Sequence, residues 1–199
     1  MKRILLTGFE PFYKASQNPT QEIVKAIEGL SLSGVTTMVL PVVFGKASQL
    51  VKLRIDEIHP DIVIMLGQAE GRTQITPEKI AINLDDARIE DNEGNQPTQQ
   101  AIVPEGADGL FSTLPVTRIV ELLKESNIPS GVSLSAGTFV CNHIFYAVQS
   151  HCLEKNIQSG FIHVPLMESQ VGEFPGLPTM PLATMIDAIK LIITELSQG

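Results

Sequence analysis

The chain has 199 residues, of which 43% are apolar and 18% are charged. This composition predicts a single globular domain over residues 1–199, large enough to bury a full core. The formal net charge is −8, and lysine and arginine do not cluster, which argues against nucleic acid as a partner. The longest apolar runs are far shorter than a bilayer crossing needs, so we expect no membrane partner either.

The first part of the chain alternates short apolar runs with amphipathic stretches. A helix is predicted to begin at Pro19 and to end at about residue 27, with Asn18 or Thr20 as its cap. The N-terminal apolar run stops after three residues, which is too short for the core of a signal peptide and favours a buried strand. The first predicted elements are strands at 3–7, 35–43 and 61–67 and a second helix at 46–58.

The second part continues the alternation after an irregular stretch. Residues 75–84 alternate like one arm of a hairpin, and the polar residues 85–104 indicate a long excursion outside the core. The later predicted elements are a helix at 117–125, a strand at 131–135, a helix at 141–153, a strand at 160–165 and a helix at 179–196. The whole pattern predicts an α/β fold, a three-layer α/β/α sandwich around a twisted, mostly parallel mixed sheet.

Cys141 stands where a β-prone run gives way to an apolar helix. At a helix N-terminus, free backbone amides and the helix dipole favour a thiolate, which is the nucleophilic form of cysteine. A free cysteine is also commonly a small buried hydrophobe, so the local sequence leaves both interpretations open. Cys152 falls on the same predicted helix, about 16 Å away at a rise of about 1.5 Å per residue. This distance excludes a disulfide between them. A count of only two cysteines, with no secretory signal, predicts a reducing cytoplasm.

Unusual residues follow several of the predicted strands. In open α/β sheets, ligands bind outside the carboxyl ends of the strands. That edge receives Phe9 and Phe12 from the first loop, Gln68 from another, and Cys141 and His163 from the later strands. A single loop phenylalanine often only packs against the edge of the hydrophobic core. The convergence of these five residues, however, predicts a ligand-binding site.

A cysteine nucleophile needs a base, because a thiol with a pKa of about 8.5 is mostly protonated at neutral pH. His143 follows Cys141 by two positions and points elsewhere on a helix. His163, at the end of a strand, is the better candidate. A base also needs a group that orients its ring, and Glu78 is a candidate, although an exposed glutamate is the alternative.

Nine strings along nearly the whole chain together resemble the type I pyroglutamyl peptidases, the pyrrolidone-carboxylate peptidase family. They are TGFEPF (7–12), NPT (18–20), LPVVF (40–44), GQA with GR (67–72), EKIAIN (78–83), DARI with DNEGNQP (86–97), FSTLP (111–115), SAGTFVCNH (135–143) and FIHVP (161–165).

The resemblance implies a cysteine peptidase that removes an N-terminal pyroglutamyl residue from peptides through a thioester. It matches Cys141 to the nucleophile, His163 to the base and Glu78 to the orienting carboxylate. The substrate-side matches are Arg88 near the oxyanion, Phe9 and Phe12 lining the pyroglutamyl pocket, and Gln68 beside it. No cofactor or metal is expected, and no histidine and cysteine spacing resembles a zinc site. A homo-oligomer, commonly a tetramer, is implied, with residues 168–181 as a possible contact loop.

Four residues, at three places in the chain, depart from the pattern of the resemblance. Tyr13 and Lys14 replace a common Gly-Gly pair, Leu134 replaces a common asparagine, and Glu90 replaces a usual proline. Two other functions remain open on the sequence. One is a ligand-binding module without turnover, and the other is a nucleoside phosphorylase, although the loop at 67–72 carries an acidic residue that would repel phosphate.

Overall fold

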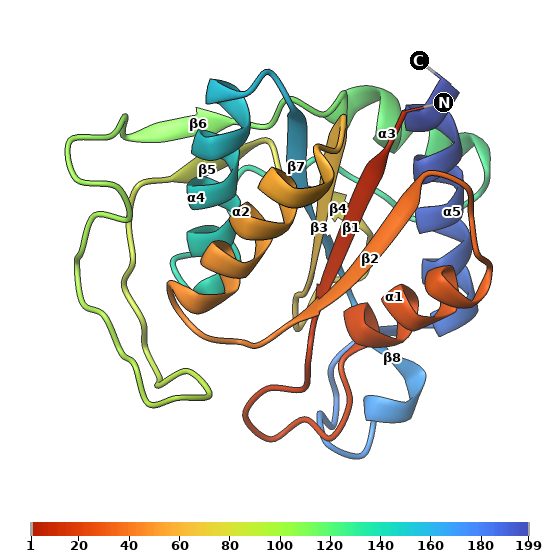
Figure 1. Ribbon diagram of the computed structural model, residues 1–199. Coiled ribbons are helices and arrows are strands. Elements are labelled where there is room, and N and C mark those ends of the chain that lie inside the picture. The colour runs from red at the N-terminus through yellow and green to blue at the C-terminus, as the bar shows by residue number, and fades with distance from the viewer. Residues whose placement is uncertain (1, 199) are drawn as a thin grey trace.

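A five-stranded sheet forms the centre of the molecule (Figure 1) in the computed structural model, which describes residues 2–198. The strand order is β2-β1-β3-β7-β4, and every neighbouring pair is parallel except β7 with β4. The strands are β1 (Ile4–Phe9), β2 (Val35–Leu40), β3 (Ile62–Gln68), β4 (Thr76–Pro77) and β7 (Gln158–Val164). The predicted mostly parallel mixed sheet is confirmed.

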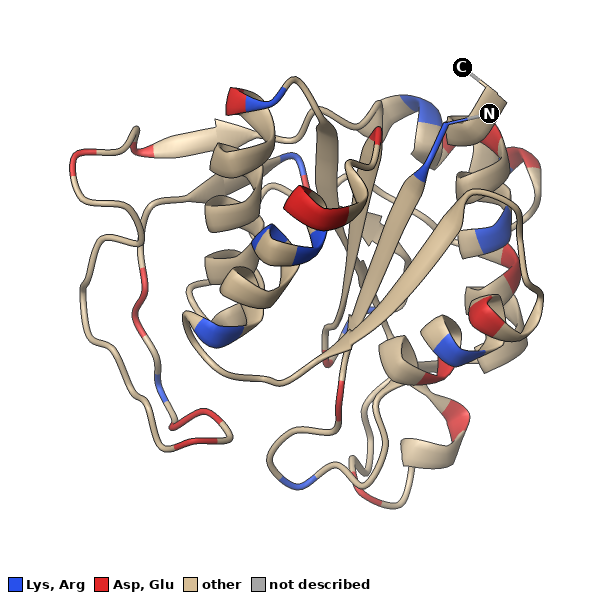
Figure 2. Cartoon of the chain, in the orientation of Figure 1, with Lys and Arg blue, Asp and Glu red and all other residues tan. Residues whose placement is uncertain are grey.

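Helices cover both faces of this sheet, which confirms the predicted three-layer sandwich (Figure 1). One core cluster joins the sheet to α1 (Pro19–Gly29), α3 (Val116–Glu125) and α5 (Leu182–Gln198). The other joins it to α2 (Lys46–Ile58) and α4 (Val140–Glu154). Burial on both faces explains why β1, β3 and β7 carry no charged residue, and Figure 2 shows charge gathered on helices and loops instead.

Local signals set the ends of two helices. The Asn18 side chain accepts a 2.9 Å hydrogen bond from the Thr20 amide and caps α1, as predicted. The closing helix α5 starts at Leu182 rather than at residue 179, because Thr179–Met180 forms β9, which pairs with β8 (Leu166–Met167). A single 3₁₀ turn, η1 (Glu168–Gln170), follows β8. No helix between residues 2 and 198 has both the length and the apolarity for a membrane crossing.

Two predictions about the strands are wrong. Residues 75–84 are not one hairpin arm, because β4 joins the main sheet whereas β5 (Ile80–Ile82) pairs with β6 (Gly109–Phe111) in a separate sheet. Residues 131–135 form no strand, and only isolated bridges such as Glu78 to Ser133 tie this segment to the sheet edge. Its hydrophobic residues Val132 and Leu134 are exposed, so the apolar run does not mark a buried strand. The predicted excursion at 85–104 contains no helix or strand, although Asp85, Ala87 and Asp91 within it are buried.

Candidate functional site

The carboxyl ends of the central strands bring His163 and Gly67 side by side. His163 is the penultimate residue of β7, and it pairs with Gly67 on β3 and with Thr76 on β4. Its side chain is buried, with 5% of its surface exposed. The imidazole therefore lies at the predicted sheet edge and is held by strands on both sides.

Cys141 reaches this edge because α4 begins directly above Gly67. It is the second residue of α4, after Val140, and its side chain is half-buried. A Cβ atom on Gly67 would lie 3.0 Å from the Cys141 sulfur and 2.6 Å from the Phe161 ring. The absence of a side chain at Gly67 thus leaves the space that the thiol occupies.

Glu78 holds the ring of His163. Its Oε1 atom lies 2.7 Å from His163 Nδ1 and also accepts a 2.8 Å hydrogen bond from Arg72. The carboxylate is fully buried, so the exposed-glutamate alternative does not describe it. Because a carboxylate only accepts, His163 carries its proton on Nδ1 when neutral, which leaves Nε2 free to act as a base.

The protonation of these groups follows from burial and charge together. Burial raises the pKa of the Cys141 thiol to about 12, with the Glu78 charge acting in the same direction. Burial also lowers the pKa of His163 below its ordinary value, against the opposing effect of Glu78. For Glu78 itself, burial raises the pKa, but the hydrogen bond from His163, together with the charge of Arg72, outweighs it and leaves the pKa lowered. These directions favour an uncharged thiol and imidazole beside the Glu78 carboxylate in the free site, over the thiolate that the helix-start argument favours.

A cavity of about 650 Å³ opens in front of Cys141 and His163. It contains six of the seven predicted site residues, and the seventh, Glu78, lies behind His163. The residues that line it are Phe9, Phe12, Tyr13, Asn18, Val42, Gln68, Glu70, Asp86, Arg88, Ile89, Ala136, Gly137, Thr138, Phe139, Val140, Cys141 and His163.

Aromatic rings and amides shape the walls of this cavity. The rings of Phe12 and Phe139 lie 5.2 Å apart, and Phe9 is buried beneath them in the core. The Gln68 side-chain oxygen accepts a 2.9 Å hydrogen bond from Gln170 of η1, which fixes the Gln68 amide at the wall. Of the departures noted in the sequence, Tyr13 lines the cavity and Leu134 is exposed.

Sequence reasoning missed the part that Arg72 takes in the site. Besides Glu78, its guanidinium donates to the carbonyl of Ser135, 3.1 Å away, in the loop that leads to Cys141. The only sequence signal was the position of Arg72 in the loop after β3.

No group of three or more histidine, cysteine, aspartate or glutamate side chains within residues 2–198 is arranged to hold a metal ion.

Comparison with known proteins identifies the family. The family model described as pyroglutamyl peptidase matches residues 2–198. A pyrrolidone-carboxylate peptidase of Bacillus cereus (strain B4264) is 48% identical, with 97% of this chain and 92% of that protein covered. One from Enterobacter sp. (strain 638) is 45% identical, with 98% and 92% covered.

Solved structures agree with the sequence matches. The crystal structure of pyroglutamyl peptidase I from Bacillus amyloliquefaciens superposes with a TM-score of 0.92 at 41% identity, over 96% of this chain and 95% of that one. A mutant pyrrolidone carboxyl peptidase from P. furiosus gives a TM-score of 0.93 at 39% identity, over 99% of both chains. With matches of this extent in sequence and in structure, the chain belongs to the pyroglutamyl peptidase family.

Proposed function

We propose that residues 1–199 act as one catalytic domain that hydrolyses the bond after an N-terminal pyroglutamyl residue, with Cys141 as nucleophile. His163 is the general base and then the general acid, and Glu78 orients its ring. Family membership supplies the reaction class, a cysteine peptidase acting on pyroglutamyl peptides. The contacts of the three side chains support their roles.

The cavity suits a neutral, five-membered lactam. Pyroglutamate has no free amine, so its pocket needs apolar walls and a few hydrogen bonds to the lactam N–H and C=O. Phe9 and Phe12 supply apolar surface, and the side-chain amide of Gln68 is held at the wall by Gln170. A charged N-terminal ammonium would lose hydration on entering this apolar pocket, a cost that the neutral lactam does not carry.

Attack begins from the neutral pair. Because the thiol and the imidazole are both uncharged in the free site, His163 Nε2 takes the thiol proton as the Cys141 sulfur bonds to the pyroglutamyl carbonyl carbon. The positive charge then created on the imidazole lies next to the Glu78 carboxylate, 2.7 Å from Nδ1, and is stabilised by it. Glu78 therefore contributes most once the proton has moved.

The oxygen that becomes negative needs donors. The first turn of α4 has no side-chain cap, which leaves its backbone amides available to the oxyanion beside Cys141. The Arg88 guanidinium, also at the cavity wall, adds positive charge. His163 next protonates the leaving amine, and the peptide departs. Water, deprotonated by the same imidazole, cleaves the thioester and releases pyroglutamate.

The observation that carries the proposal is the shared cavity of Cys141 and His163, with Glu78 bonded to the buried side of the imidazole. The test compares release of a fluorogenic amine from a pyroglutamyl amide and from a prolyl amide, which keeps a charged nitrogen. We expect turnover of the first only, and none with Cys141→Ala in a folded protein. Turnover retained by Cys141→Ala overturns the assignment.

We further propose that the enzyme is a homotetramer in the cytoplasm. Two free thiols, Cys141 and Cys152, support a reducing compartment. Val171 and Leu177 are exposed on the segment 168–181, which supports a role for it in subunit contact. Light scattering after size exclusion tests the assembly, and a monomeric mass contradicts it.

A further inference from the structure

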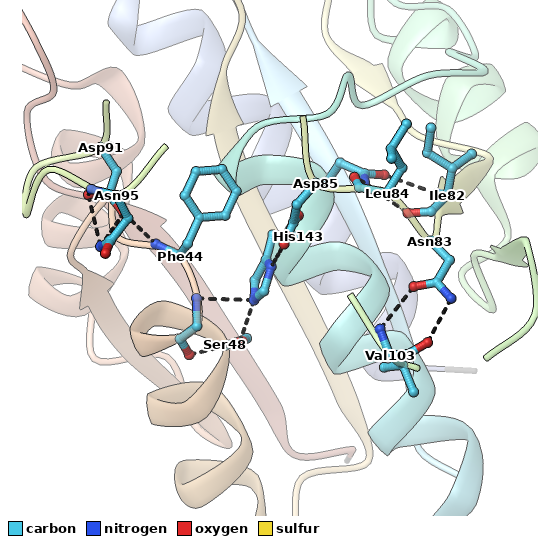
Figure 3. Close-up of polar contacts among 12 residues, drawn as sticks. Phe44, Ser48, Ile82, Asn83, Leu84, Asp85, Asp91, Asn95, Val103 and His143 are labelled. Atoms are coloured by element: carbon cyan, nitrogen blue, oxygen red, sulfur yellow. Dashed lines mark hydrogen bonds and ion pairs between the residues drawn. The ribbon is translucent and has the colours of Figure 1, made fainter. Parts of the chain in front are cut away.

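His143 sits in a buried polar cluster (Figure 3). It follows Cys141 by two positions in the first turn of α4, and it is not among the residues that line the cavity. Nδ1 lies 2.7 Å from Asp85 Oδ2, and Nε2 lies 3.1 Å from the backbone nitrogen of Gly45. The ring of Phe44 packs edge-on against the imidazole, with centroids 5.6 Å apart. These partners come from two segments of the chain outside α4, the loop at Phe44 and Gly45 and the stretch at Asp85.

The hydrogen bonds fix the tautomer of His143. The Gly45 N–H donates to Nε2, so the proton of the neutral ring is on Nδ1 and is donated to Asp85. Ser48 completes a serine, histidine and aspartate set, with its hydroxyl 3.1 Å from Nε2 and 2.9 Å from the Gly45 carbonyl. This set is not a second catalytic centre, because it is buried and a backbone amide already occupies Nε2.

The segments that His143 joins are walls of the active-site cavity. Asp85 precedes Asp86, whose backbone amide donates to the Thr138 carbonyl at 3.0 Å, three residues before Cys141. Thr138 returns a 2.8 Å hydrogen bond from its hydroxyl to the Asp86 carbonyl. Arg88 follows in the same strip of chain, residues 85–88, and lines the cavity. His143 is therefore bonded to the start of the strip that carries Arg88.

The other partner of His143 is fixed from a second side. The amide of Phe44, next to Gly45, donates to Asp91 at 2.8 Å (Figure 3). Phe44 also packs edge-on against Phe139, with ring centroids 5.1 Å apart, and Phe139 lines the cavity. The loop at 44–45 is thus held by α4 and by the excursion at once.

We propose that His143 is a positioning residue, which locks the Cys141 end of α4 to the strip that carries Arg88 and to the loop at Phe44 and Gly45. The inference rests on the proposed function, because it assigns Cys141 as nucleophile. Asp85 contributes as a hydrogen-bond acceptor through Oδ2, which accepts from His143 Nδ1, whereas its second oxygen, Oδ1, is buried without a partner in the structure of residues 2–198. An amide in its place keeps one oxygen for the His143 proton, whereas an apolar side chain keeps none.

The experiment combines turnover with thiol access. His143→Phe keeps an aromatic ring against Phe44 but removes the hydrogen bonds to Asp85, Gly45 and Ser48. We expect its kcat on a pyroglutamyl amide to fall about 10-fold to 100-fold, with a smaller change in KM, because misplacement of about 1 Å costs on that order. Alkylation by iodoacetamide, resolved for each cysteine by mass spectrometry, should become several times faster at Cys141. Cys152, fully buried further along α4, should stay protected.

A matched control lies on the same helix. His151 also bonds an aspartate, Asp56, at 3.0 Å, but near the far end of α4. His151→Phe should leave kcat and the alkylation of Cys141 unchanged. Asp85→Asn should stay close to the wild type and Asp85→Leu should match His143→Phe, which keeps the test informative if one variant folds poorly.

Several results overturn the proposal. One is a wild-type kcat in His143→Phe. Another is an equal acceleration of alkylation at Cys141 and Cys152, which indicates general unfolding. The third is an equal loss of kcat in Asp85→Asn and Asp85→Leu. Failure of the proposed function is seen separately, as turnover retained by Cys141→Ala. The alkylation comparison needs no turnover, so it tests His143 in that case as well.

Discussion

Oε1 of Glu78 accepts hydrogen bonds from both His163 and Arg72, at 2.7 Å and 2.8 Å, while its second oxygen is buried without a partner in the described residues 2–198. One oxygen thus joins the proposed base to a permanent cation. Arg72 in turn bonds the Ser135 carbonyl in the loop before Cys141. The orientation of the imidazole and the path of the loop before Cys141 are coupled through this single carboxylate.

Replacing Glu78 with glutamine tests its charge separately from its shape. The amide oxygen can still accept from His163, but the negative charge that stabilises the imidazolium is gone. We expect kcat to fall by about 10²-fold to 10⁴-fold, on the scale known for such orienting carboxylates, with little change in KM. Glu57→Gln, on the α2 surface, is the control. Steady-state kinetics on a pyroglutamyl amide measure both, and a Glu78→Gln enzyme with wild-type kcat contradicts the role.

The acid side of the pH profile should report His163. Only the neutral imidazole accepts the thiol proton, so activity is present above its pKa and is lost as the pH falls through it. Burial lowers the pKa of His163 from an ordinary value of 6.5. The acid limb of kcat/KM, which reports the free enzyme, should therefore have its midpoint below 6.5. A midpoint at or above that value argues against a buried neutral base.

Removing the charge of Arg72 should shift the acid limb of the kcat/KM profile. The guanidinium lowers the pKa of His163, so Arg72→Met should raise it and shift the acid midpoint of kcat/KM to higher pH. Arg72→Lys keeps a positive charge and should stay closer to the wild type. The two variants are compared by pH profiles in the same buffers. An unchanged midpoint in Arg72→Met means that the cation does not act on the base.

Much of the fold was predictable because burial leaves a clear pattern. The apolar β3 and the capped start of α1 at Asn18 follow from local sequence alone, and both are confirmed. The exposed apolar residues Val132 and Leu134 misled the strand prediction at 131–135, because sequence periodicity does not tell which face meets solvent. The split of β4 and β5 between two sheets depends on distant partners, which no short window contains.

The site was predictable where sheet topology alone gathers residues. The rule that ligands bind at the carboxyl ends of strands placed Cys141 and His163 together, and both line the cavity. His143 was set aside as a base for another reason, because residues two positions apart do not share a face of a helix, and its absence from the cavity lining supports this. Neither argument could find the bonds of His143 to Asp85 and Gly45, because these join residues 58 and 98 positions apart.

Gly67 should tolerate no side chain. A Cβ atom there would lie 2.6 Å from the Phe161 ring and 3.0 Å from the Cys141 sulfur, and neither the buried ring nor the start of α4 can move freely. We expect Gly67→Ala to lower the free energy of unfolding by about 1–3 kcal/mol, as overpacking of a core typically does. Displacement of the thiol should also reduce kcat/KM by about 10-fold or more.

The control for this change is Gly29→Ala. Gly29 is the last residue of α1, and a Cβ atom there meets nothing within 4 Å. Alanine favours a helix over glycine, so this variant should keep full activity and equal or slightly higher stability. Urea unfolding and kinetics on a pyroglutamyl amide compare the two variants directly. If Gly67→Ala matches Gly29→Ala in both measurements, the thiol does not depend on the space above β3, and the proposed approach of Cys141 to the sheet edge is wrong.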